Sequence, residues 1–156
     1  MSFFGLDLAQ KGLSLYTIPA AFVMAMLPNV YAVSGAGAHY DLCNPRKIQT
    51  SVVADDKIDK IAKARILRAK AASENAFETL GFYSAAVVAA NFSGVDAETV
   101  NVLTLGYIGS RALYNIIYVR LQDNRSFGPV RSLAWLASIA ITVTLYAKAA
   151  TQLASS

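Results

Sequence analysis

Charged residues are nearly absent from four long stretches of the chain, which alternate with shorter segments that hold most of the charge. These apolar stretches lie between Lys11 and Asp41, Glu78 and Asp96, Glu98 and Arg120, and Arg131 and Lys148, with Arg111 alone inside the third. A helix needs about 20 mostly apolar residues to cross about 30 Å of hydrocarbon. The pattern therefore predicts four membrane-crossing helices, near Leu13–Ala36, Leu67–Phe92, Thr99–Leu121 and Val130–Ala149.

The segment that precedes the second helix, Val53–Arg68, has apolar residues spaced among acids and bases. This spacing is typical of an amphipathic helix at a membrane surface, so we expect a helical approach to the second crossing. Pro28 is expected to kink the first helix, because proline removes a backbone hydrogen bond. No repeat or composition change divides the chain, which predicts a single domain over residues 1–156.

Composition supports a membrane protein over a soluble one. Apolar residues make up 55% of the 156 residues and charged residues 15%, against about 25% charged residues in a typical soluble domain. The net charge of +4 is small and scattered, which argues against nucleic acid as a partner. With one cysteine, Cys43, and one histidine, His39, no metal site built on these ligands is expected.

Basic residues are unevenly divided between the loops. Four crossings place both termini and the loop near Ser93–Glu98 on one side, and the loops Asp41–Ile66 and Gln122–Pro129 on the other. The second side carries most of the loop cations: Arg46, Lys47, Lys57, Lys60, Lys63, Arg65, Arg120, Arg125 and Arg131. By the positive-inside rule, the basic loops face the cytoplasm and both termini face outward or toward the lumen.

Polar side chains inside the predicted crossings are the candidates for chemistry, because ionisable groups at membrane depth are costly. On the second helix, Arg68, Asn75 and Glu78 fall within about 80° of one another. On the third, Arg111, Tyr114 and Tyr118 form one stripe, which continues to Tyr107. The tyrosines alone also fit ordinary packing or an interfacial belt.

Glu78 and Arg111 lie at similar predicted depths, about 13–15 Å inside Arg68 and Arg120 respectively. The two side chains are therefore expected to pair, within a subunit or between subunits. Such a pair fits two roles equally well: it can stabilise the packing of two helices, or it can contact a ligand. At the start of the fourth helix, Arg131 and Trp135 taken alone also fit a snorkelling arginine and an interfacial aromatic residue.

Taken in order, these motifs resemble the MAPEG superfamily, the membrane-associated proteins in eicosanoid and glutathione metabolism. The resemblance covers most of the chain and rests on short motifs in successive helices: Asn44-Pro45, Arg68 with Asn75-Ala76-Phe77-Glu78, Arg111-Ala112-Leu113-Tyr114 with Tyr118, and Pro129-Val130-Arg131-Ser132-Leu133-Ala134-Trp135. The last motif is most similar to the branch of microsomal prostaglandin E synthase and microsomal glutathione transferase.

The resemblance implies an all-α integral membrane protein: a bundle of four transmembrane helices that assembles as a homotrimer and holds glutathione between subunits. Arg131 and Ser132 then match catalytic positions beside the thiol. The positions implied to bind glutathione are Arg68, Asn75, Glu78, Arg111, Tyr114, Tyr118 and Trp135. The expected partners are membrane lipids and a small lipophilic substrate, and in a eukaryote the location is the endoplasmic reticulum with both termini lumenal.

These roles have a chemical reason. A free thiol has a pKa near 8.5, so a fixed guanidinium and a hydroxyl donor favour the thiolate that attacks lipophilic electrophiles or peroxides. The sequence also departs from the family pattern. Ala71 and Glu74 replace basic residues of many members, and no arginine lies in Ala32–Tyr40. We therefore keep two hypotheses: a glutathione transferase or peroxidase, and a non-catalytic lipid-binding scaffold that resembles the lipoxygenase-activating member.

Overall fold

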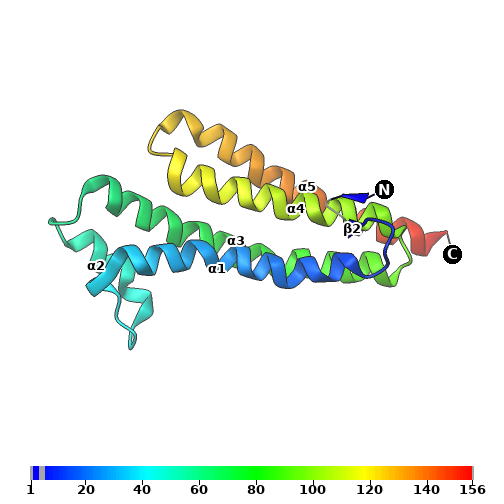
Figure 1. Ribbon diagram of the computed structural model, residues 1–156, viewed down its shortest axis with the longest axis horizontal. Helices are drawn as coiled ribbons and strands as arrows, with labels where there is room; N and C mark the ends of the chain where they lie inside the picture. Colours follow the sequence, from blue (N-terminus) through cyan, green and yellow to red (C-terminus); the bar gives the residue numbers. More distant parts are fainter. Residues whose placement is uncertain (1, 4–5, 156) are drawn as a thin grey trace.

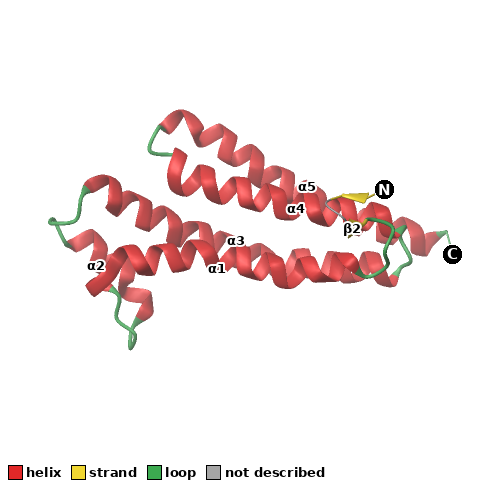
Figure 2. Cartoon of the chain, in the orientation of Figure 1, coloured by secondary structure: helices red, strands yellow, loops and turns green. Residues whose placement is uncertain are grey.

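The computed structural model describes residues 2–3 and 6–155 and is mainly helical (Figures 1 and 2). The elements in chain order are β1 (Ser2–Phe3), β2 (Leu6–Asp7), η1 (Leu13–Tyr16), α1 (Thr17–Ala36), η2 (Gly37–His39), η3 (Pro45–Lys47), α2 (Ile48–Ala54), α3 (Lys60–Phe92), α4 (Ala97–Ile116), η4 (Ile117–Leu121), η5 (Arg125–Phe127) and α5 (Gly128–Ala154). The two-residue strands pair antiparallel and were not expected from the sequence.

The four long helices form two antiparallel pairs, α1 with α3 and α4 with α5 (Figure 1). The pairs are joined mainly through contacts of α3 with α5 and of α1 with α4. Both termini and the short α3–α4 turn lie at one end of the bundle, and α2 and the α4–α5 turn lie at the other (Figure 1). The predicted helices are therefore present and the predicted loops share ends as expected, and α1 continues through Pro28 as one helix.

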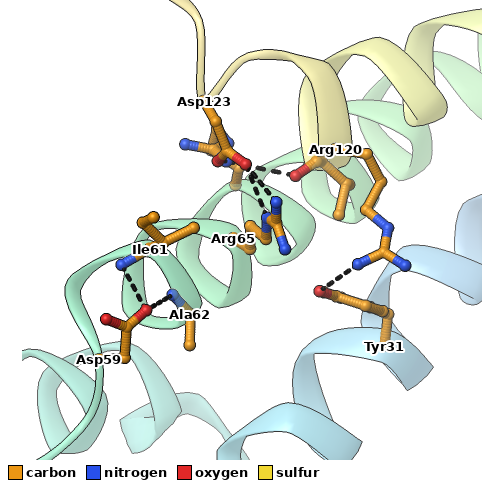
Figure 3. A network of polar contacts seen from close by, with 9 residues as sticks. Tyr31, Asp59, Ile61, Ala62, Arg65, Arg120 and Asp123 are labelled. Atoms are coloured by element: carbon orange, nitrogen blue, oxygen red, sulfur yellow. Dashed lines mark hydrogen bonds and ion pairs between the residues drawn. The ribbon is translucent and has the colours of Figure 1, made fainter.

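The predicted helical approach to the second crossing is confirmed from Lys60 onward, where it forms the first turns of α3. It is wrong for residues 55–59, which separate α3 from the end of α2 at Ala54. The carboxylate of Asp59 accepts hydrogen bonds from the backbone N–H groups of Ile61 and Ala62, at 2.9 and 3.0 Å (Figure 3). These bonds satisfy donors that a helix start leaves unpaired, so Asp59 fixes where α3 begins.

Small residues fill the interior of the bundle, and large apolar residues cover its outside. The buried residues include many alanines, among them Ala25, Ala32, Ala69, Ala72 and Ala86. Large exposed apolar side chains occur on all four long helices: Phe22, Leu27, Phe77, Phe82, Val102, Leu113, Leu133, Leu136 and Val143. Small residues let neighbouring helices approach closely, and lipid can solvate large apolar side chains on the outer face. This arrangement is therefore typical of membrane helices.

Two helical segments, Leu13–His39 and Arg125–Ala154, are long and apolar enough by length and composition to cross a membrane. Helices α3 and α4 carry more polar and charged residues, and several of these, including Ser73, Asn101 and Thr104, are buried. Tyr83 of α3 shares a 2.6 Å hydrogen bond with Thr17, and its ring stacks on Tyr107 of α4 with centroids 3.6 Å apart. Tyr107 is thus a packing residue at the centre of the bundle.

The end of the bundle near the N-terminus is fastened by Asn101 of α4. Its amide nitrogen donates to the carbonyl oxygens of Leu8 and Gln10 at 2.7 and 2.9 Å, and its oxygen accepts from the Ser14 N–H at 2.8 Å. The buried amide thereby uses both of its polar atoms. This end is closed by hydrogen bonds, whereas the α2 end carries the candidate site.

Candidate functional site

A pocket of about 500 Å³ lies among α3, α4, η4 and α5. It is lined by Ala71, Asn75, Tyr114, Tyr118, Arg131, Ser132, Trp135 and Leu136. Six of the nine site residues expected from the sequence therefore meet in one place, although they come from three separate parts of the chain. The other three, Arg68, Glu78 and Arg111, do not line the pocket.

Arg131 and Trp135 offer unused hydrogen-bond donors at this pocket. The Arg131 guanidinium lies 4.6 Å from the centre of the Tyr118 ring, a cation–π distance. Its Nε and the indole Nε1 of Trp135 are both buried and have no hydrogen-bond partner. Buried donors are nearly always satisfied in folded proteins, so two of them beside a pocket indicate a place for an acceptor.

The first turns of α5 explain why these side chains lie there. Gly128 and Pro129 begin the helix, and proline suits this position because no N–H is required. Arg131 and Ser132 follow within the first helical turn, and Trp135 comes one turn after Arg131, on the same face of the helix. The hydroxyl of Ser132 donates to the Gly128 carbonyl oxygen at 3.2 Å. The positive end of the helix dipole favours an anion near these residues.

Arg111 lies directly behind the pocket wall and is 2% exposed. Its Nη1 and Nη2 atoms donate to the Asn75 Oδ1 at 3.4 and 3.3 Å, and its guanidinium lies 4.6 Å from the centre of the Tyr114 ring. Arg111 thus positions two lining residues. Arg111 contacts only the oxygen of the Asn75 amide. The N–H groups of that amide are therefore available to donate to a ligand.

The predicted pair of Glu78 with Arg111 does not form within the chain. Glu78 is exposed, and no ion pair among the described residues joins it to Arg111. Asn75, three residues before Glu78 on α3, faces Arg111 instead and accepts its hydrogen bonds. A pair between subunits stays a prediction.

Arg68 is held at the rim of the bundle, one turn before Ala71. Its Nη2 donates to a carboxylate oxygen of Asp123 and, at 3.3 Å, to the Val119 carbonyl oxygen. Arg65 forms a second ion pair with Asp123, including a 2.9 Å bond from its Nε (Figure 3). Asp123 in the α4–α5 turn therefore fastens this turn to α3.

Asp123 is a structural residue that sequence reasoning missed. The signal was available, since Asp123 is the single acid in the basic loop Gln122–Pro129. The Arg65 guanidinium, and after it that of Arg68, hold the pKa of the Asp123 carboxyl below its usual range. In the same region, Arg120 donates to the Tyr31 hydroxyl at 3.4 Å, which ties η4 to α1 (Figure 3).

The helical bundle, with its apolar outer surface and a cation-bearing pocket, has the character of an α-helical membrane protein. In the part of the chain that the structure describes, no cluster of three or more His, Cys, Asp or Glu residues is arranged to hold a metal. The chain belongs to the MAPEG family, whose sequence model matches residues 13–151. Searches among curated proteins and among solved structures gave no match.

Proposed function

We propose that this chain is a glutathione-dependent membrane enzyme of the transferase or peroxidase type, acting on lipophilic electrophiles or peroxides. Family membership supports a membrane protein with a function related to glutathione. The observation that carries the proposal is the pair of buried, unpartnered donors of Arg131 and Trp135 at the pocket. A tripeptide thiol with carboxylate and carbonyl oxygens provides the acceptors that such donors require.

The pocket residues suit glutathione in chemically distinct ways. Glutathione, when bound, supplies a thiol that becomes a nucleophile once ionised. Arg131 stabilises negative charge, and the Ser132 hydroxyl can turn from the Gly128 carbonyl toward the same charge. Asn75 presents amide N–H groups to a peptide carbonyl, while Tyr114 and Tyr118 supply aromatic walls. We assign Arg131 and Ser132 to catalysis and these three residues, with Trp135, to binding.

Arg111 is a positioning residue in this proposal, because its guanidinium holds Asn75 and Tyr114 in place from behind. Glu78 is exposed and does not line the pocket, and it suits a contact with a second copy or with the amino group of the ligand. We further propose a homotrimer of four-helix transmembrane subunits. Exposed Ser132 and Leu136 leave the pocket open on one chain, so a neighbouring subunit would cover it. We also propose that the chain belongs to the branch of microsomal prostaglandin E synthase and microsomal glutathione transferase, which its Pro129–Trp135 motif resembles, and that in a eukaryote it lies in the microsomal membrane.

A second candidate function is a non-catalytic scaffold that presents a lipid to a partner enzyme. Ala71, which carries no charge, lines the pocket, and an adjoining groove of about 610 Å³ is mainly apolar. It is lined by Gln49, Thr50, Val53, Ala54, Leu67, Ala71 and Glu74. A groove of this kind suits an acyl chain as well as it suits a lipophilic substrate.

Titration of the bound thiol tests the proposal. Detergent-solubilised protein should bind glutathione in calorimetry, and the ultraviolet absorbance of bound thiolate should titrate below the ordinary thiol pKa of about 8.5. Arg131→Leu should retain binding but raise the pKa of the bound thiol by about one unit or more, equivalent to ~1.4 kcal/mol. Arg131→Lys should restore part of the effect, because it returns the charge without the forked donor.

Arg125→Leu is the matched control, since Arg125 is an exposed arginine in the adjacent turn and does not line the pocket. It should leave the pKa of the bound thiol unchanged. Absence of glutathione binding would favour the scaffold. Binding with an unshifted thiol in Arg131→Leu would contradict the catalytic assignment of Arg131.

A further inference from the structure

Pro28 lies inside α1 and is buried in the bundle. In an α-helix the N–H of residue 28 would donate to the carbonyl oxygen of Met24, but proline has no N–H to donate. A backbone carbonyl without a partner is costly at membrane depth, where no bulk water replaces the missing donor. Helix α1 nevertheless continues from Thr17 to Ala36. The Met24 carbonyl therefore needs a donor from outside α1.

Asn115 of α4 supplies this donor. Its amide Nδ2 donates to the Met24 carbonyl oxygen at 3.0 Å, across the contact between α1 and α4. One residue further along α1, the carbonyl oxygen of Ala25 accepts a 2.8 Å hydrogen bond from the buried hydroxyl of Ser73 on α3. Side chains from two other helices therefore bind adjacent backbone carbonyls of α1, in the turn before Pro28.

The two bonds differ in what they replace. The residue four positions after Ala25 keeps its N–H, so Ser73 is an additional donor there. The residue four positions after Met24 is Pro28, so Asn115 replaces a donor that is missing. The Oδ1 atom of Asn115 is buried without a hydrogen-bond partner among the described residues, which costs free energy. An amide kept at this cost indicates that its nitrogen is needed at the Met24 carbonyl.

The Asn115 bond joins the two helix pairs that enclose the candidate pocket (Figure 1). Ala71 and Asn75 of α3 line one side of the pocket, and residues of α4, η4 and α5, including Arg131, line the other. The width of the pocket therefore depends on the spacing between the α1–α3 pair and the α4–α5 pair. Tyr114, the neighbour of Asn115 in the chain, lines the pocket and moves with any shift of α4 away from α1.

We propose, on the basis of the function proposed above, that Asn115 is a positioning residue of the glutathione site. Its amide replaces the hydrogen bond that Pro28 withholds from Met24, and this bond fixes α4 against α1. The bond thereby keeps Asn75 and Arg131 at the separation at which the first holds the tripeptide and the second faces its thiol. Asn115 acts through these residues, because its amide is bound to α1 and it does not line the pocket.

A double-mutant cycle between Pro28 and Asn115 tests the replacement of the missing bond, without any ligand. Asn115→Leu keeps the approximate shape of the side chain but removes the donor, so the thermal midpoint of the detergent-solubilised assembly should fall by about 2–5 °C. Pro28→Ala returns the backbone N–H of residue 28 to Met24. The loss caused by Asn115→Leu should therefore be about half as large, or smaller, in the Pro28→Ala background.

Tyr146→Phe is the matched control, because the Tyr146 hydroxyl also donates to a backbone carbonyl of another helix, that of Phe82, at 3.1 Å. The residue four positions after Phe82 is Ala86, which has its own N–H. The effect of Tyr146→Phe on the thermal midpoint should therefore be the same in the wild-type and Pro28→Ala backgrounds.

The effect on the pocket is tested with reduced glutathione. Asn115→Leu should weaken binding about threefold to tenfold, the effect of about one hydrogen bond. It should also raise the pKa of the bound thiol toward its ordinary value near 8.5, because Arg131 then lies farther from the sulfur. Pro28→Ala should restore both quantities in the double variant. A residue with a purely structural role would change the thermal midpoint but not the pKa of the bound thiol.

Equal thermal effects of Asn115→Leu in both backgrounds would overturn the inference, since the amide would then not replace the bond that Pro28 withholds. Thermal coupling with wild-type glutathione affinity and thiol pKa in Asn115→Leu would also overturn it, while leaving the proposed function intact. Wild-type protein that binds no glutathione would overturn the proposed function and the positioning role together. If Asn115→Leu alone does not fold, folding of the double variant is the expected rescue, and failure of both variants to fold would contradict the inference.

Discussion

A guanidinium inside a helical bundle needs hydrogen-bond acceptors close by, because removing its charge from water is costly. Arg111 finds one acceptor in the Asn75 oxygen and a favourable aromatic face in Tyr114. Neither partner carries a formal charge, so the positive charge of Arg111 is not cancelled locally. This residual charge lies behind the pocket wall and adds to the field of Arg131, which favours an anionic ligand.

The contact of Asn75 with Arg111 predicts a measurable coupling energy. Asn75→Leu leaves the buried guanidinium without its acceptor and should lower the free energy of unfolding by about 1.5–3 kcal/mol. In a double-mutant cycle with Arg111→Leu, the two effects should be less than additive. The same cycle for Glu78 and Arg111 should show much weaker coupling within one chain. Stronger coupling for Glu78 would mean that the pair forms between subunits.

Trp135 provides a spectroscopic report of ligand binding, because it is the single tryptophan of the chain and lines the pocket. Its Nε1 is buried without a partner, so an acceptor on a bound ligand should change the emission of the indole. We expect glutathione to shift or quench the fluorescence with the affinity that calorimetry measures. Ser132→Ala should retain this signal. An emission that stays constant at saturation would place the ligand elsewhere.

At the scale of the elements, the α4–α5 turn is positioned by charge more than by apolar packing. Asp123 pairs with two arginines of α3, while the exposed positions around it, Asn124, Arg125 and Ser126, face solvent. The α4–α5 turn leads directly into the first turn of α5, which carries Arg131 and Ser132. The geometry of the pocket therefore depends on an ion-pair cluster outside it.

This dependence predicts a response to acid. The fold lowers the pKa of Asp123, so its ion pairs are fully present above the ordinary aspartate range, near 3.9, and are lost as the pH falls through the lowered value. The protection of the residue 122–127 amides against hydrogen exchange, measured relative to the intrinsic exchange rate at each pH, should therefore fall at low pH in the wild type. Asp123→Asn should show the faster exchange already at neutral pH. Equal exchange in both proteins at neutral pH would show that the ion pairs do not hold the turn.

At the scale of the whole molecule, the chain places small residues inside and large apolar residues outside, which is the arrangement a lipid environment favours. The basic segments near α2 and η5 lie at one end, and both termini lie at the other (Figure 1). One end of the bundle therefore presents many cationic side chains, and the other end presents few. We infer that the cationic end and its pocket face the cytoplasm.

Protease accessibility in sealed vesicles tests this orientation. A cleavage site inserted near Asp56, an exposed residue in the break between α2 and α3, should be cut from the cytoplasmic side. Tags at both termini should be protected from the same protease. The same cleavage site placed in the short turn after α3, near Gly94, serves as the control and should be protected as well. Cutting of either terminal tag would reverse the orientation.

The sequence by itself determined the helices and the family. Long stretches without charge require helices of about the observed length, because only a helix satisfies its own backbone hydrogen bonds in an apolar environment. Residues near the start of α5 and along α3 and α4 could be named as site residues because polar groups are costly there. Six of these, including Asn75 and Arg131, do line one pocket.

Only the tertiary structure decided which polar groups are free and which are engaged. Sequence spacing gives depth along a helix, but side-chain partners depend on rotation about each axis and on how helices pack. For this reason Arg111 contacts Asn75 and not Glu78, and Arg68 contacts Asp123, which lies 55 positions away in the chain. The break between α2 and α3 was likewise decided locally, by the capping carboxylate of Asp59. The charge that remains available to a ligand is a property of these contacts, because a cation already paired within the fold binds a second anion weakly.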